Sequence, residues 1–244
     1  MRKLLIIAFI IFLTTVCHGQ EVQVVSEEYV PYQYWDDEHQ ATGFGIELVS
    51  GVFKAAGIPL KGGRIDLLPW QRAYRMALNT DNAAVFMTVR NDQRENLFKW
   101  VGPLAPRTMW LYKLSSRKDI QITTLEEAKT YTVGGYQSAQ TDYLIELGFT
   151  NLEIVSHERL NIGKLLAGRI DLVPYQEQAI KQRLRDRGLG YDVVEKVVLF
   201  DDRFDYYLAL NPHIADALVS RLQVALDEIK QNGAYEVLRK KYLE

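Results

Sequence analysis

The sequence is almost free of cysteine: the 244-residue chain has one, Cys17, close to its amino terminus. A single cysteine excludes an intrachain disulfide, so the hydrophobic core must hold the fold together. Removing a short amino-terminal segment leaves roughly 225 residues, which can bury an adequate core and are comfortable as two α/β units.

Several motifs of catalysis and cofactor binding are also missing. The chain has no Gly-x-Ser-x-Gly elbow, no phosphate-binding loop and no dinucleotide-binding glycine pattern. His39, His157 and His213 are isolated and show no metal-ligand spacing to cysteine or carboxylate. We therefore expect no metal and no cofactor.

Strong charge of either sign is absent as well. The formal net charge is −2, and it becomes −4 when Arg2 and Lys3 are removed with the amino-terminal segment. Acidic and basic residues are scattered along the chain. A mildly acidic chain of this kind argues against a nucleic-acid partner. The acidic pair Asp201–Asp202 is interpreted as a solvated turn, and His157–Glu158 as a solvated loop pair.

The amino terminus carries the one long apolar run. Residues 4–13 are all apolar and follow Arg2 and Lys3, but the run is too short to span a membrane. This pattern predicts a secretory signal peptide over residues 1–19, cleaved after Gly19, and a periplasmic location. A lipid anchor on Cys17 is the alternative, although Val16 fits such processing poorly.

Strand-like and helix-like segments alternate along the rest of the chain. Residues 48–56 have apolar positions at helical spacing, whereas residues 83–89 form an apolar run typical of a buried strand. The alternation occurs twice and predicts two α/β lobes, each with a mostly parallel sheet flanked by helices. Expected strands cover 21–26, 65–68, 83–89, 110–114, 131–134, 153–155, 170–173, 193–200 and 206–210. Expected helices cover 46–56, 70–78, 125–128, 141–147, 161–167, 176–187, 214–231 and 234–242.

The stretch 87–104 is the most informative part of the sequence. A strand ends in a polar turn that carries Arg90 and Arg94, and Trp100 follows shortly after. A guanidinium just past a strand end suits a bidentate grip on a carboxylate. Arg94 is predicted to hold a ligand carboxylate, whereas Arg90 is predicted to be structural or to lie at the rim of the site.

An aromatic loop near the amino terminus adds a second signal. Tyr29, Tyr32, Tyr34 and Trp35 lie within seven residues, and Trp70 opens a predicted helix after Pro69. Aromatic faces in a cleft stack on flat or cationic ligands. Tyr29 and Trp70 are therefore candidate ligand contacts, with packing inside a lobe as the alternative for both.

Several short phrases, in this order, resemble family 3 of the bacterial extracytoplasmic solute-binding proteins, the amino-acid type. They span almost the whole chain beyond the signal peptide and comprise Tyr-Val-Pro-Tyr (29–32), Gly-Phe-Gly-Ile-Glu-Leu (43–48), the turn 91–94, Trp-Val-Gly-Pro (100–103), 133–139 and Leu-Leu-Ala-Gly-Arg-Ile-Asp-Leu (165–172). The resemblance implies a type II, periplasmic-binding-protein-like fold with two hinge crossings, near 106–111 and 203–208. Residues 20–107 with 206–244 would form lobe 1, and 108–205 would form lobe 2.

The resemblance also implies roles for particular residues. In lobe 1, Arg94 would bind the α-carboxylate of the ligand, and Tyr29 would stack on the ligand. Trp70 would line the rim of the cleft, and Thr88 would lie near the position where family members contact the ligand through a hydroxyl group. In lobe 2, Ser138 stands in a Gly-Thr phrase of the family, and Gln176 falls where the family has the acid that binds an ammonium group.

Gln176 is an uncharged amide, so the amino-acid character of the ligand is open at this point. The neighbouring Glu177 would replace the acid if the register slipped by one residue. Asp171 is predicted to cap or pair within its own lobe.

The expected function is that of a monomeric receptor that closes around a small carboxylate-bearing ligand, such as an amino acid, for an ABC-type permease. One alternative is a sensory binding protein that works without a permease. Another is a periplasmic dehydratase-like enzyme on the same scaffold, with Glu177 as the general acid.

Overall fold

The computed structural model describes residues 21–136 and 138–244. The predicted signal peptide, 1–19, and the possible anchor Cys17 lie outside the described residues. Within the described chain, no helix is both long enough and apolar enough to cross a membrane.

Helices and strands alternate through most of the chain, as expected. The helices are α1 (Phe44–Ala55), α2 (Trp70–Asn79), α3 (Leu125–Ala128), α4 (Ala139–Glu146), α5 (Arg159–Leu166), α6 (Glu177–Arg185), α7 (Asp216–Gln231) and α8 (Ala234–Leu243). The strands are β1 (Gln23–Ser26), β2 (Tyr34–Trp35), β3 (Ala41–Thr42), β4 (Asp66–Leu67), β5 (Ala83–Val89), β6 (Lys99–Pro106), β7 (Met109–Leu114), β8 (Val133–Tyr136), β9 (Leu152–Val155), β10 (Val173–Tyr175), β11 (Val194–Asp201) and β12 (Asp205–Leu210).

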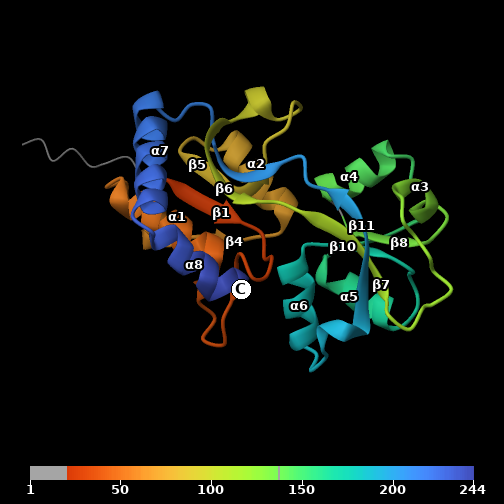
Figure 1. Ribbon diagram of the computed structural model, residues 1–244. Coiled ribbons are helices and arrows are strands. Elements are labelled where there is room, and N and C mark those ends of the chain that lie inside the picture. The colour runs from red at the N-terminus through yellow and green to blue at the C-terminus, as the bar shows by residue number, and fades with distance from the viewer. Residues whose placement is uncertain (1–20, 137) are drawn as a thin grey trace, which may run out of the picture.

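The first lobe is built on a five-stranded sheet of order β4-β1-β5-β12-β6. Strands β4, β1 and β5 run parallel, whereas β12 runs antiparallel to both β5 and β6. Helices α1, α7 and α8 gather at one side of this lobe (Figure 1). Its core includes Phe44, Phe53 and Phe86, each at most 1% exposed.

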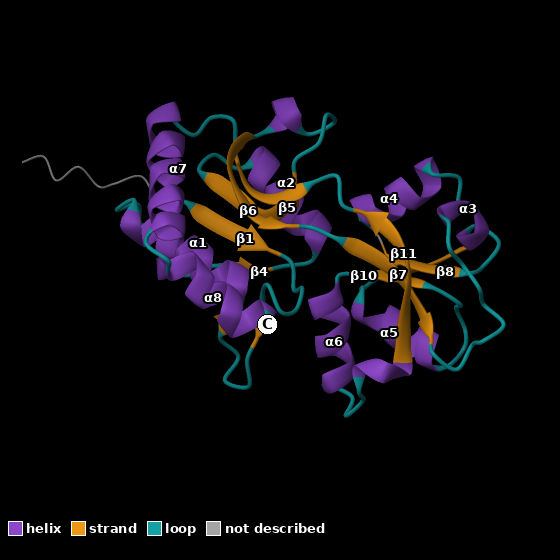
Figure 2. Cartoon of the chain, viewed as in Figure 1, coloured by secondary structure: helices purple, strands orange, loops and turns teal. Residues whose placement is uncertain are grey.

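The second lobe contains β7 to β11 and helices α3 to α6 (Figure 2). Strands β10, β7 and β11 form an antiparallel sheet, and β8 pairs in parallel with β9. A single parallel bridge, between Val133 and Leu172, connects β8 to the segment before β10. A separate apolar cluster around Leu111, Leu144 and Phe149 fills the space under α3 and α4.

Two extended segments connect the lobes (Figure 1). Strand β6 of the first sheet leads through Arg107 and Thr108 into β7 of the second, and β11 returns through residues 202–204 into β12. Because these long strands run antiparallel to their neighbours, strand directions are more mixed than the alternating sequence pattern suggests. The sheet memberships support lobe boundaries that we propose at 20–107 with 206–244, and at 108–205.

Candidate ligand-binding site

The candidate site residues follow the carboxyl ends of parallel strands. In the first lobe, Glu27 follows β1, Trp70 follows β4 and Arg94 follows β5. In the second lobe, Tyr136 ends β8 and Glu158 follows β9. Since parallel strands present their carboxyl ends at one edge of a sheet, ligands of α/β proteins bind at such edges. Here the edges of the two lobes face each other.

A cavity lies where these edges meet, with about 530 Å³ of space that is partly open to solvent. Both lobes line it. The first lobe contributes Glu27, Tyr29, Gln33, Trp70, Met87, Val89, Arg94, Arg107 and Tyr206, and the second contributes Met109, Tyr136, Ser138 and Gln140. The lining is rich in aromatic side chains, with two guanidinium groups and a single carboxyl group.

Arg94 is the guanidinium most available to a ligand. Its side chain is half-buried, and burial lowers its pKa without removing its charge. Nη1 donates a hydrogen bond of 3.4 Å to the carbonyl of Val89, and the guanidinium lies 5.7 Å from the ring of Trp70 and 5.1 Å from that of Tyr74. Among the described residues, no carboxylate lies within ion-pair distance of Arg94. A buried, aromatic-walled cation of this kind can bind a ligand carboxylate.

Arg107 lies in the same cavity but is already paired. It is 7% exposed at the first crossing and bonds Asp201 at the second, with 2.5 Å between Nη1 and Oδ2. Burial alone would lower the pKa of Arg107, but electrostatic interactions with Tyr206 and Asp201, and the hydrogen bond to Asp201, outweigh burial and raise the pKa. Asp201 also accepts a 2.9 Å bond from Arg203. The expectation that Asp201 is a solvated turn residue was wrong, because the two crossings pack together and bury it.

The loop that carries Tyr29 is fixed by the start of α1. Backbone amides at this helix end donate hydrogen bonds to carbonyls of the loop. The Phe44 amide donates to the Pro31 carbonyl at 3.2 Å, and the Gly45 amide donates to the Tyr32 carbonyl at 2.6 Å. Gly43 has φ 116°, and a Cβ there would lie 2.6 Å from the Tyr32 carbonyl, so this close approach requires glycine. Tyr29 stacks on Tyr32 with ring centroids 5.9 Å apart. Tyr29 is thereby held against the cavity.

Glu27 is the carboxyl group of the cavity. Part of its side chain reaches cleft solvent, but both lobes surround it. Burial, and then the charge of Glu158, raises the pKa of Glu27 from 4.5 to about 8. Glu27 is therefore mostly protonated near neutral pH, which is typical of a functional cleft.

A second cavity of about 620 Å³ adjoins the first and shares Glu27, Trp70 and Tyr136 with it. Its buried part contains Glu158 and Arg183, whose Oε2 and Nη2 atoms are 3.0 Å apart. Glu158 is 8% exposed, so the expectation that it is a solvated loop residue was wrong. It lies at the start of α5 and is covered by α6, which carries Arg183.

Gln176 lies between the lobes but does not line either cavity. It is 3% exposed, and its side-chain oxygen accepts a hydrogen bond from the hydroxyl of Tyr32. Its Nε2 donates to the hydroxyl of Tyr206 at 2.7 Å. The amide that we considered for ligand binding therefore connects lobe 2 to two tyrosines of lobe 1.

The structure thus brings together four of the six residues that the sequence nominates. Tyr29, Trp70, Arg94 and Ser138 line the first cavity. Thr88 is fully buried in β5, and its hydroxyl donates to the Val85 carbonyl at 3.5 Å. Thr88 and Gln176 stand behind the cavity wall, and the contacts of all six with a ligand stay predictions.

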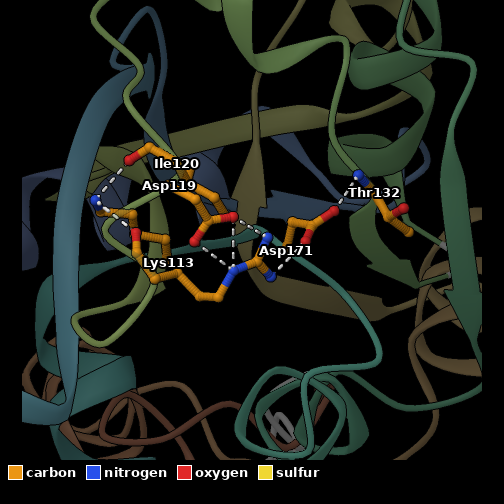
Figure 3. Close-up of polar contacts among 6 residues, drawn as sticks. Lys113, Asp119, Ile120, Thr132 and Asp171 are labelled. Atoms are coloured by element: carbon orange, nitrogen blue, oxygen red, sulfur yellow. Dashed lines mark hydrogen bonds and ion pairs between the residues drawn. The ribbon is translucent and has the colours of Figure 1, made fainter.

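Two further acids near Gln176 are engaged inside lobe 2. Asp171 accepts hydrogen bonds from the Thr132 amide at 3.0 Å and from Arg117 at 2.8 Å (Figure 3), and it lines neither cavity. Glu177 pairs with Lys181 at 2.7 Å and Lys196 at 2.5 Å, and these hydrogen bonds lower its pKa. The expected pairing of Asp171 within its own lobe is confirmed.

Sequence reasoning missed Glu27, Arg107 and Glu158. The position of Glu27, directly after the first predicted strand, was a usable signal, because that strand end faces the cleft. Arg107 and Glu158 depend on partners far along the chain and had no local signal. Within the described ranges, no group of three or more potential metal ligands was found.

Comparison with known proteins agrees with this geometry. The model of the bacterial extracellular solute-binding proteins, family 3, matches residues 22–244. An ancestral arginine-binding protein bound to arginine is similar in structure, with a TM-score of 0.79 at 16% identity over 92% of this chain and 99% of that one. A histidine kinase sensor domain with similarity to periplasmic binding proteins also has a TM-score of 0.79, at 18% identity over 92% of this chain and 96% of that one.

A Salmonella typhimurium periplasmic binding protein described by its high arginine specificity has a TM-score of 0.75 at 16% identity, over 93% of this chain and 100% of that one. No curated protein matches the sequence. At such identities the likeness shows the fold alone, and it confirms the two-lobed, type II arrangement.

Proposed function

The chain belongs to family 3 of the bacterial extracellular solute-binding proteins, and we propose that it is a periplasmic receptor for a small acid. Its lobes close around the ligand, whose carboxylate binds Arg94, and the receptor delivers it to an ABC-type permease. Ligand favours the closed form because only that form contacts it from both lobes.

One observation carries this proposal. Arg94 lies in the cavity between the lobes with no carboxylate partner among the described residues, while Arg107 beside it is paired with Asp201. A half-buried guanidinium with no ion-pair partner among the described residues favours an anionic ligand. The aromatic faces of Tyr29 and Trp70 add surface for stacking.

A thermal-shift screen of the purified protein tests the proposal. The panel contains α-amino acids, ω-amino acids, keto acids, dicarboxylates and amines without a carboxylate. An acid at 100 times its Kd should stabilise the protein by about 2.7 kcal/mol, which raises Tm by several degrees. If amines without a carboxylate stabilise the protein and acids do not, the proposal is wrong.

A sensory role is the second candidate, and the structural likeness to a histidine kinase sensor domain favours it. Deletion of the gene separates the two roles. Loss of ligand uptake supports delivery to a permease. Unchanged uptake, with loss of a ligand-dependent transcriptional response, supports a sensor.

An enzymatic role finds less support. The candidate acid Glu177 has a lowered pKa and two lysine partners, whereas a general acid needs a raised pKa. The neutral carboxyl group of the cleft is Glu27. Incubating prephenate- or arogenate-like acids with the protein tests this role, and a flat time course excludes turnover of those substrates.

A further inference from the structure

Two carboxyl groups from different lobes face each other across the second cavity. Glu27 comes from the first lobe and Glu158 from the second, and both line the cavity. Their interaction is unfavourable when both are charged, because the cleft shields them from water. Closure of the lobes therefore costs electrostatic energy unless a proton or a cation compensates.

Glu158 is positioned to accept a further hydrogen bond. Its Oε2 accepts from Arg183, but its Oε1 is buried and has no donor among the described residues. The Glu158 side chain is only 9% exposed. A buried carboxylate oxygen without a donor is costly, so a donor from the ligand would bind favourably there.

The two cavities adjoin, and side chains from both lobes line each of them. They share Glu27, Trp70 and Tyr136, so a chain that begins at Arg94 can pass these aromatic rings and reach Glu158. Aromatic faces also attract cations. The cleft thus offers a cation for the ligand at one end and carboxyl groups at the other.

Gln176, for which the family resemblance implies a role at the ligand ammonium, is engaged by the protein itself. Gln176 bonds Tyr32 and Tyr206, and it carries no charge. Of the described residues that line the first cavity, Glu27 is the only carboxylic acid. A positive group on the ligand therefore finds its acid partners toward the second cavity and not beside Gln176.

We propose that the cleft selects acids whose positive group is remote from the carboxylate: an ω-amino or ω-guanidino acid with its carboxylate on Arg94 and its cation between Glu27 and Glu158. This inference builds on the proposed function, since it uses the same cleft and the same arginine. An α-ammonium group is not required, and it gains nothing from Gln176.

The other charges of the second cavity do not favour a dicarboxylate. Arg183 pairs with Glu158 through Nη2, and its buried Nε, beside that pair, has no acceptor among the described residues. Glu28, His157 and Arg159 are exposed. A second ligand carboxylate would have to approach Glu158 itself. The cation is the group that relieves the contact between the two acids.

Isothermal titration calorimetry with a six-carbon series tests the proposal. The series comprises hexanoate, 2-aminohexanoate, 6-aminohexanoate, lysine and adipate, with ω-amino acids of four to eight carbons to find the best length. We expect the best ω-amino acid to bind at least about tenfold tighter than hexanoate, 2-aminohexanoate and adipate, a difference of about 1.4 kcal/mol. Tighter binding of 2-aminohexanoate or adipate than of every ω-amino acid would overturn the proposal.

Variants locate the effect. Glu158→Gln and Glu27→Gln should each remove most of the preference for the ω-amino acid over hexanoate. The matched control is Glu153→Gln, since Glu153 is an exposed acid of the second lobe that pairs with Lys164. This variant should leave the ω-amino preference unchanged. An unchanged preference in both cleft variants would contradict the proposal. If acids bind through Arg94 but the protein prefers an α-ammonium group, the proposed function stands and this inference is wrong. If no acid binding depends on Arg94, both are wrong.

Discussion

Tyr32 of the first lobe donates a hydrogen bond from its hydroxyl to the side-chain oxygen of Gln176 in the second lobe. The two residues are 144 positions apart in sequence, and Gln176 in turn donates to Tyr206. This contact connects the lobes directly and is buried on all sides. The second lobe therefore contacts the first through the uncharged amide of Gln176.

The first prediction concerns this contact. Tyr32→Phe removes the hydroxyl donor, and a lost neutral hydrogen bond of about 1 kcal/mol should shift the lobes roughly fivefold toward the open form. Small-angle X-ray scattering of the ligand-free protein should then give a larger radius of gyration. Tyr34→Phe, in the adjoining strand β2, is the control. Identical scattering of both variants and the wild type would mean that the contact does not hold the lobes closed.

The crossing segments give a stability prediction. Asp201→Asn leaves Arg107 without its counter-ion at 7% exposure, which should destabilise the protein by about 3 kcal/mol and lower Tm by roughly 6–12 °C. Asp66→Asn is the control, because its partner Arg64 has a side-chain exposure of 76%. Its effect should stay within about 0.5 kcal/mol. Equal losses of Tm in the two variants would contradict a special role for the buried pair.

Glu27 makes stability depend on pH. Its pKa is about 8 in the folded protein against 4.5 for the free side chain, so the folded state binds the proton more tightly. The contribution of Glu27 to folding stability is therefore favourable in acid relative to alkali and falls as the pH rises from 4.5 to 8. The charged groups around it are Arg94 and Arg107 in the first cavity and Glu28, His157, Glu158, Arg159 and Arg183 in the second.

Urea denaturation of Glu27→Gln across this pH range checks the effect. The variant should match the wild type near about pH 4 and exceed its free energy of unfolding near about pH 9, by on the order of 1–2 kcal/mol. If the difference between variant and wild type stays constant with pH, Glu27 does not carry the shifted pKa.

Ligand binding should also move a proton. A cation placed beside Glu27 lowers the pKa of this carboxyl group, so an ω-amino acid should release close to one proton per site near pH 7. Calorimetry in two buffers of different ionisation enthalpy measures this release. Hexanoate is the control and should release none. Equal proton release by the two ligands would place the cation elsewhere.

Local patterns predicted the helices better than the connections. Apolar spacing placed α7 and α8 within two residues of their observed bounds, because an amphipathic face is a property of the segment itself. Strand β6 was missing from the expected strands; it contains Gly102 and Pro103, which disfavour strands, yet it pairs with β12. Pairing with a distant strand overrode the local preference.

The candidate site shows the same difference between residues with a local sequence signal and residues without one. Arg94 and Trp70 were predictable because each follows a strand whose end was visible in the sequence. Glu158 and Asp201 looked like solvated charges, and both are buried by partners in distant segments: Arg183 is 25 positions from Glu158, and Arg107 is 94 from Asp201. Such pairs form only when the lobes and crossings assemble, so no window of sequence reveals them.

The guanidinium of Arg94 is the centre of the functional account, and a pair of arginine variants tests it most directly. Arg94→Ala and Arg90→Ala remove the same group from the same turn, but Arg90 is half-exposed and bonded to Glu95 at 2.6 and 2.7 Å. Calorimetric titration with the best acid should show a loss of at least about 2 kcal/mol, roughly 30-fold in Kd, for Arg94→Ala and little change for Arg90→Ala. Equal affinity in Arg94→Ala and wild type would contradict the account.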